Sequence, residues 1–323
     1  MTSIPTIAAL LCMSATQKAW EHIFTKRGTP AILDSFKTLF PYDNLDHWNF
    51  SPLHKAVLGV EGFTLSQFVD SSTSVPGVHP DNTDAQQRTA LHWAALRGDL
   101  SAVELLLNVK ADVHVVDEFN CTPLTYAASA AIPRIVELLI LSGANVNHVN
   151  GRGDSPLHYA ARHKDDVESV RILVHAGAEV DRKNPLGNTP FAGAAIANRT
   201  AAGKYLLDEG ADRYSTNKYG DSPLRETIHH NCHEFLCMLL EDGARYDDTN
   251  NHGSSLLHAI ALEGDIKTIQ IVKAAHLSGL DHQLKNTRGE TAMDFCHKRI
   301  GAPEGFKEAF SDLVSTLPVT SLS

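Results

Sequence analysis

The sequence lacks several features that would assign it to a functional class. No apolar run reaches about 18 residues, the length that a membrane-spanning helix needs, so a transmembrane segment is excluded. Basic residues are scarce, with 28 lysines and arginines against 38 aspartates and glutamates and a formal net charge of −10. Because a protein that binds the phosphate backbone needs a basic face, we expect no direct contact with nucleic acid.

Cysteine is also scarce, and its placement bears on the compartment. The five cysteines are Cys12, Cys121, Cys232, Cys237 and Cys296. An odd, scattered set is a poor disulfide framework and predicts free thiols in a reducing compartment. The short apolar run at 7–13 has no basic residue before it, which favours a buried helix over a secretory signal. We therefore expect an intracellular protein, located in the cytoplasm, the nucleus or both.

The sequence contains 43% hydrophobic and 20% charged residues, which is the composition of a folded protein and excludes wholesale disorder. Length alone suggests two domains of about 150 residues each, but a repeated tetrapeptide divides the chain more finely. It has the form Ser/Thr–x–hydrophobic–x and begins at Ser51, Thr89, Thr122, Ser155, Thr189, Ser222, Ser255 and Thr291. Most spacings are 33 or 34 residues, which indicates stacked supersecondary units.

Each tetrapeptide has the chemistry of a helix start. Its Ser or Thr hydroxyl can cap the free backbone N–H groups of the first turn. The proline that often follows has no backbone N–H, which costs nothing at the first helical position because that N–H would have no partner within the helix. A second apolar stripe then predicts another helix, for example at Val103, Leu106 and Leu107. Glycines such as Gly143 follow these stripes and predict left-handed caps, and the polar stretches beyond them predict hairpin-like turns.

These units resemble ankyrin repeats, whose consensus joins a β-hairpin, a Thr-Pro-Leu-His helix and an antiparallel second helix. The match begins near Asp46 and is closest to the consensus between 88 and 184, and the whole is similar to the ankyrin arrays of fungal multidomain proteins. The resemblance implies a mainly α fold, an α-solenoid with β-hairpin-like loops, about eight stacked repeats and helical caps. It divides the chain into an N-terminal helical cap at 1–44, a solenoid at 45–317 and a tail at 318–323.

Two groups of residues suggest chemistry at first sight. The string His229-His-Asn-Cys-His233, followed by Cys237, contains zinc-ligand types, but its place in the repeat puts it across a turn between helices, where the ligands would not converge tetrahedrally. The tetrapeptide histidines His54, His92, His158 and His258 occupy a position that is structural in ankyrin repeats, where the side chain bonds nearby backbone and the Ser/Thr hydroxyl. We therefore expect no metal, no cofactor, no catalytic residue and no enzymatic activity.

What remains is a surface for a protein partner. The resemblance implies binding through the hairpin tips and the exposed side of the first helices, where aromatic and arginine side chains are the usual anchors. The predicted partner-binding residues are Trp48, Trp93, Arg97, Phe119, Tyr126, Arg152, Tyr159, Arg162, Leu186 and Tyr219. For the three aromatic residues on the helices, Trp93, Tyr126 and Tyr159, the alternative is that they fill space between neighbouring repeats. Arg97 and Arg162 suggest a local basic strip that would accept an acidic peptide.

These expectations combine into a function. The first hypothesis is a monomeric, non-catalytic scaffold or adaptor that binds an unidentified protein on the concave face and the hairpin tips, with no nucleic-acid or membrane partner. The alternative is a regulatory subunit, such as a transcriptional coregulator that acts through another protein. A weaker alternative is an accessory protein or enzyme in a biosynthetic pathway, which would need convergent catalytic groups that the sequence does not show.

Overall fold

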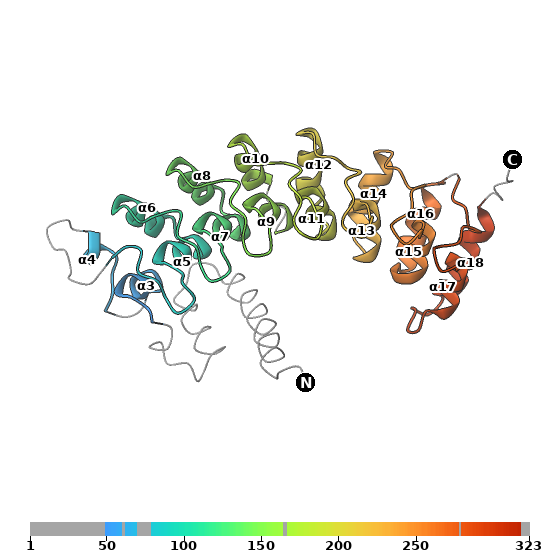
Figure 1. Cartoon of the computed structure of the whole chain (residues 1–323), viewed down its shortest axis with the longest axis horizontal. Helices are drawn as coiled ribbons and strands as arrows, with labels where there is room; N and C mark the ends of the chain where they lie inside the picture. Colours follow the sequence, from blue (N-terminus) through green and yellow to red (C-terminus); the bar gives the residue numbers. More distant parts are fainter. Residues whose placement is uncertain (1–48, 60–61, 70–78, 164–166, 278, 318–323) are drawn as a thin grey trace. The chain divides into compact units, whose positions relative to one another are not determined.

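A computed structural model of the chain describes residues 49–59, 62–69, 79–163, 167–277 and 279–317 (Figure 1). The chain divides into two compact units, residues 1–151 and residues 152–323, which are described in turn. The expected helical cap at 1–44 and the tail at 318–323 lie outside the described residues. No helix in the described ranges has both the length and the apolar character needed to cross a membrane.

The first unit consists of short helices, most of them in pairs. Its helices are α3 (Pro52–Val57), α4 (Ser66–Val69), α5 (Ala90–Arg97), α6 (Leu100–Asn108), α7 (Pro123–Ala130) and α8 (Pro133–Leu141). Within this unit the first helix of one pair packs on the first helix of the next, α5 on α7, and the second helices pack likewise, α6 on α8 (Figure 1).

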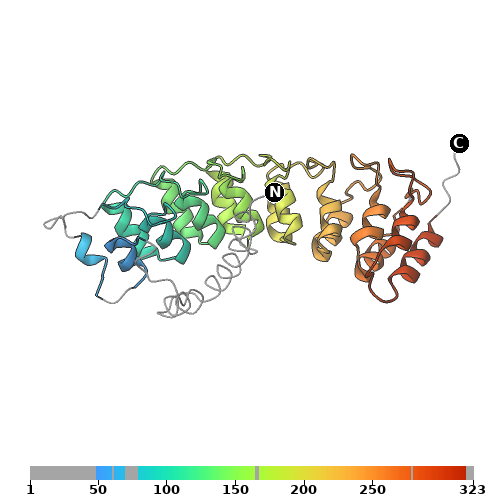
Figure 2. The same ribbon diagram turned by 60° about the horizontal axis from the view of Figure 1, so that its bottom comes forward.

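The second unit repeats the same plan. Its helices are α9 (Pro156–Arg162), α10 (Val167–His175), α11 (Pro190–Ile196), α12 (Thr200–Asp208), α13 (Pro223–His229), α14 (His233–Glu241), α15 (Leu256–Glu263), α16 (Ile266–Ala274), α17 (Ala292–Lys298) and α18 (Phe306–Thr316). The odd-numbered helices pack on one another in sequence, and α18 packs on both α16 and α17. Within each unit the loops that follow the second helices lie along one edge of the helices (Figure 2).

The helices begin where the local chemistry places them. Each tetrapeptide Ser or Thr is the N-cap, in extended backbone conformation, of the helix that follows it. The hydroxyl of Thr122, for example, accepts a hydrogen bond from the backbone N–H of Thr125, and Pro123 occupies the first helical position. After α8, Gly143 has a φ of 92°, a left-handed conformation that ends the helix at low cost for glycine.

The core of each unit lies between the two layers of helices. Small residues fill the first helices, such as Ala94 and Ala95 of α5, and aliphatic residues fill the second helices. In α6 the buried residues are Ala102, Val103 and Leu106, whereas the predicted Leu107 is only half-buried. Small side chains in the first helices let neighbouring helices approach closely, so each pair buries its apolar face against the next.

Candidate protein-binding surface

The loops that project beyond the helices are built on one repeated turn. An Asp or Asn side-chain oxygen accepts two hydrogen bonds, from the backbone N–H groups of the residues two and four positions later in the sequence. In the first unit Asp117 Oδ1 accepts from Phe119 at 2.9 Å and from Cys121 at 2.7 Å. The same pair of bonds forms at Asp84, Asn184, Asn217, Asn250 and Asn286. Asp and Asn are favoured in such turns because their short side chains replace a backbone acceptor.

This turn fixes which residue stands at the tip of each loop. We define the tip residues as those two positions after the Asp or Asn, namely Gln86, Phe119, Leu186, Tyr219, His252 and Arg288. Their neighbouring backbone groups join successive tips within a unit: Lys218 N–H donates to the Leu186 carbonyl at 2.8 Å, and Asn251 N–H donates to the Tyr219 carbonyl at 3.0 Å. With these backbone groups paired, the side chains are what a tip presents to solvent.

Three tip side chains are large, apolar and exposed. Phe119 is 50% exposed in the first unit, and Leu186 and Tyr219 are 46% and 50% exposed in the second. Arg152, another predicted partner-binding residue, is also exposed. Aromatic residues and arginine are enriched at protein interfaces, and a backbone held by a bonded turn loses little freedom on binding.

Two of the predicted partner-binding residues on the first helices, Trp93 and Tyr126, make contacts that stabilise the fold. Trp93 is only 2% exposed; its Nε1 donates to Asp84 Oδ2 at 3.0 Å, and the Arg88 guanidinium lies 4.2 Å from its ring centre. Tyr126 is half-buried, and its hydroxyl donates to Asp117 Oδ2 at 2.6 Å. Burial, together with the negative charge of Asp117, raises the pKa of Tyr126 well above its usual value. For Trp93 this geometry favours the packing alternative, because almost none of its surface is open to a partner.

The other predicted residues lie in varied places. Arg97 is half-buried, and its Nη1 donates to the Val57 carbonyl. Tyr159 is half-buried, with its ring parallel to that of His163 at 6.0 Å between centres, and Arg162 is exposed. Trp48 lies outside the described residues.

In the histidine-rich string of the second unit, His229 and His233 pair with different carboxylates. His229 Nδ1 lies 2.5 Å from Glu263 Oε2, and His233 Nε2 lies 2.9 Å from Asp265 Oδ1. Cys232 donates from its thiol to the Ile196 carbonyl at 3.2 Å. Within the described ranges no three His, Cys, Asp or Glu side chains are grouped so that they could hold a metal ion.

The tetrapeptide histidines join neighbouring repeats. The backbone N–H of Thr89 donates to His92 Nδ1 at 3.0 Å, so the ring proton is on Nε2, which donates to the Cys121 carbonyl at 3.1 Å. His54, His158 and His258 make the equivalent pair of contacts. Burial lowers the pKa of His92 to about 4 and also lowers the pKa of the other three, so all four act as neutral structural donors near pH 7.

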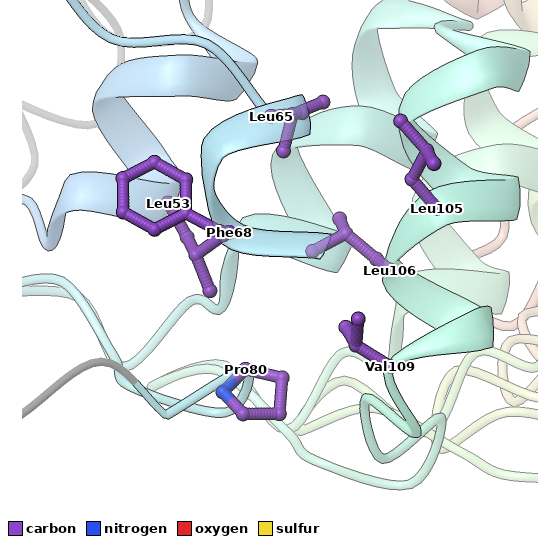
Figure 3. A pocket seen from close by; sticks show the side chains of 7 residues that line it. All are labelled: Leu53, Leu65, Phe68, Pro80, Leu105, Leu106 and Val109. Carbon is purple, nitrogen blue, oxygen red and sulfur yellow. The ribbon is translucent and has the colours of Figure 1, made fainter. Parts of the chain in front are cut away.

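Each unit also contains a cavity. The cavity of the first unit has a volume of about 50 Å³, and the side chains that line it are apolar: Leu53, Leu65, Phe68, Pro80, Leu105, Leu106 and Val109 (Figure 3). It is far smaller than the roughly 300–1,000 Å³ of typical ligand pockets, and its lining residues carry no polar side chain to orient a ligand. The cavity of the second unit measures about 270 Å³ and is lined by charged, polar and aromatic side chains. Sequence reasoning missed it, although one signal was present: Ser222-Pro-Leu-Arg225 is the tetrapeptide that ends in arginine.

Paired helices capped by Ser or Thr and joined by projecting turns define a protein of the ankyrin class. The family model for ankyrin repeats, which spans three copies, matches residues 22–117, 61–150, 91–184 and 157–250. The chain belongs to the ankyrin repeat family, whose fold is a module of protein–protein interaction.

Relatives and solved structures agree with this assignment. Tyrosine-protein kinase Shark of Drosophila melanogaster is 34% identical over 59% of this chain and 20% of its own length. Human B-cell lymphoma 3 protein is 28% identical over 67% of this chain and 49% of its own length. The chain thus spans half or less of these relatives.

Two solved structures share the fold. The ankyrin repeat domain of human ASB11 matches with a TM-score of 0.61 and 22% identity, over 70% of this chain and 98% of that one. The ankyrin repeat domain of Bcl-3 matches with a TM-score of 0.57 and 25% identity, over 74% of this chain and 99% of that one. The expected α-solenoid class is confirmed.

Proposed function

We propose that this protein is a non-catalytic scaffold or adaptor that captures a protein partner through its tip residues. The observation that carries the proposal is the repeated turn, which holds exposed Phe119 in the first unit and exposed Leu186 and Tyr219 in the second. Anchors whose backbone is already fixed before binding lower the entropic cost of association.

Paired variants test this proposal. Phe119→Ala with Tyr219→Ala removes two exposed tip rings, and we expect it to abolish capture of partner proteins in co-purification while thermal unfolding stays unchanged. The matched control is Leu141→Ala with Tyr214→Ala, which truncates two side chains of similar exposure, 75% and 46%, away from the tips. Undiminished capture by the tip variant, or equal loss in the control, contradicts the assigned surface.

A regulatory role is the second candidate. It is supported by the similarity to human B-cell lymphoma 3 protein and to the nuclear factor NF-kappa-B p105 subunit of Gallus gallus, which is 31% identical over 65% of this chain. In this role the protein acts on gene expression through a DNA-binding partner rather than through its own acidic surface. Nuclear accumulation of a tagged chain, together with a DNA-binding protein among its co-purified partners, distinguishes the coregulator from a cytosolic adaptor.

A further inference from the structure

Arg225 occupies the position that histidine holds in four other tetrapeptides. Those histidines donate from Nε2, at 2.8–3.1 Å, to the carbonyl that directly precedes the N-cap of the following repeat. Their Nδ1 atoms face the cap residue of their own helix, so both ring nitrogens of each histidine are used.

Arg225 performs the same structural task with part of its side chain. Its Nη2 donates to the carbonyl of Ser254, which directly precedes the N-cap Ser255, and its Nε donates to Asp221 Oδ1 at 3.0 Å. The residue is only 1% exposed. Its Nη1 is buried and has no hydrogen-bond partner among the residues that the structure describes. A buried charged donor without an acceptor is costly, so an anion close to this guanidinium would stabilise it.

Arg225 lines the cavity of about 270 Å³ in the second unit, together with three tip residues, Tyr219, His252 and Arg288. The exposed Leu262 and the half-buried Phe295 supply apolar wall. A cavity of this size is slightly below the roughly 300–1,000 Å³ that enclose drug-sized molecules, and it suits one or two side chains of a bound peptide.

The charge of the lining favours an anion. Its members include two arginines, Arg225 and Arg288, against one carboxylate, Asp221. Asp221 already bonds Arg225 and accepts from Asn250 Nδ2 at 2.9 Å, so it is satisfied within the protein. The nearby Glu263 lies against His229, and Glu226 accepts from Asn217 Nδ2 at 2.5 Å. These three carboxylates thus have protein partners, whereas the guanidinium of Arg225 keeps an unused donor.

We propose that this cavity receives the Asp or Glu side chain of an extended acidic segment of the protein partner. The carboxylate pairs with Arg288 and is attracted by the buried charge of Arg225, while an apolar neighbour in the same segment packs on Tyr219 and Leu262. The inference rests on the proposed function, because it assigns chemistry to the partner that the tips of the second unit would capture.

The test selects ligands from a phage-displayed library of random peptides on the full chain and measures the best synthetic peptide by calorimetry. We expect the selected peptides to share an acidic residue beside an apolar one. Arg288→Glu should weaken binding at least about ten-fold, because it replaces attraction by repulsion at an interface. The matched control, Arg245→Glu, reverses a 67%-exposed arginine of the same unit outside the cavity and should leave affinity within about two-fold.

A charge exchange and a conservative variant complete the design. Replacing the peptide's acidic residue by Lys should restore binding to Arg288→Glu, and Arg225→Lys should weaken the original peptide while circular dichroism verifies the fold. Selected peptides without an acidic residue, no selected peptide at all, or an affinity that Arg288→Glu leaves unchanged overturns the inference. So does self-association of the chain that Arg288→Glu abolishes, since the occupant is then a second copy. The proposed function is judged by the Phe119 and Tyr219 variant, so its failure and the failure of the inference are distinguishable.

Discussion

One carboxylate joins Phe119 to Tyr126 in the first unit. Asp117 accepts the Tyr126 hydroxyl on Oδ2 at 2.6 Å, while its Oδ1 accepts the backbone N–H of Phe119 at 2.9 Å. Trp93 makes the equivalent bond to Asp84, nine residues earlier in its own repeat. Trp93 and Tyr126 therefore brace the turns that present the tips of the first unit.

Tyr126→Phe tests this brace. The substitution leaves one oxygen of the buried Asp117 without its donor, so we expect the free energy of unfolding to fall by about 1–3 kcal/mol. Urea unfolding followed by circular dichroism measures the change. A stability equal to that of the wild type would show that Asp117 does not need the hydroxyl.

Gly187 marks a second place where the turn limits the sequence. Its φ is 79°, and an added Cβ would lie 2.7 Å from the backbone nitrogen of Lys218 in the next turn. Gly177, with a φ of 89°, has no atom within 4 Å of the same position and is the matched control. We expect Gly177→Ala to cost about 1–2 kcal/mol for the left-handed backbone alone and Gly187→Ala to cost roughly 1–3 kcal/mol more because of the clash. Equal losses of unfolding free energy would contradict the close approach of the two turns.

The buried histidines predict a loss of stability in acid. Burial lowers the pKa of His92 to about 4 from an ordinary 6.5. Between these pH values His92 is therefore protonated in the unfolded chain and neutral in the folded chain. The stability present above pH 6.5 therefore falls with decreasing pH, by about 3 kcal/mol from His92 alone once pH 4 is reached. Urea unfolding across this range measures the slope. His92→Gln should reduce it, and an unchanged slope would show that this residue does not titrate as described.

The pKa of His229 is shifted in the opposite direction from that of His92. Burial opposes its charged form, but hydrogen bonds and charges from Asp221 and Glu263 outweigh burial and raise its pKa. Its stabilising charge is fully present below the ordinary value of 6.5 and is lost as pH rises through the raised value. His229→Gln should therefore cost more unfolding free energy near pH 6 than near pH 9. An equal cost at both values would indicate a purely neutral role.

Local chemistry explains how much of the structure could be predicted. Ser or Thr caps, prolines at the first helical position and a regular period mark the helix starts without tertiary information. The tips were predicted for the same reason, because a turn at Asn184 or Asn217 is encoded by residues within four positions. The fold class followed from the resemblance to ankyrin repeats that these local signals carry.

Longer-range relationships could not be predicted. Trp93 is buried because the loop before its helix folds back on it, so that Trp93 bonds Asp84, nine residues earlier. The period of the repeat does not show this contact. The leftover donor of Arg225 arises because arginine replaces histidine, and in the same repeat the Ser222 hydroxyl has no hydrogen-bond partner among the described residues. Such a departure from a repeated motif is the signal that would have found the cavity.

In the proposed function, the tip residues contact the partner and the second helices of the pairs do not. A photoreactive phenylalanine analogue placed at position 119 tests it most directly, with the same analogue at the 75%-exposed position 141 as the control. We predict that irradiation in cell extract crosslinks a discrete partner protein from position 119 and not from position 141. Crosslinking from position 141 alone would contradict the claim.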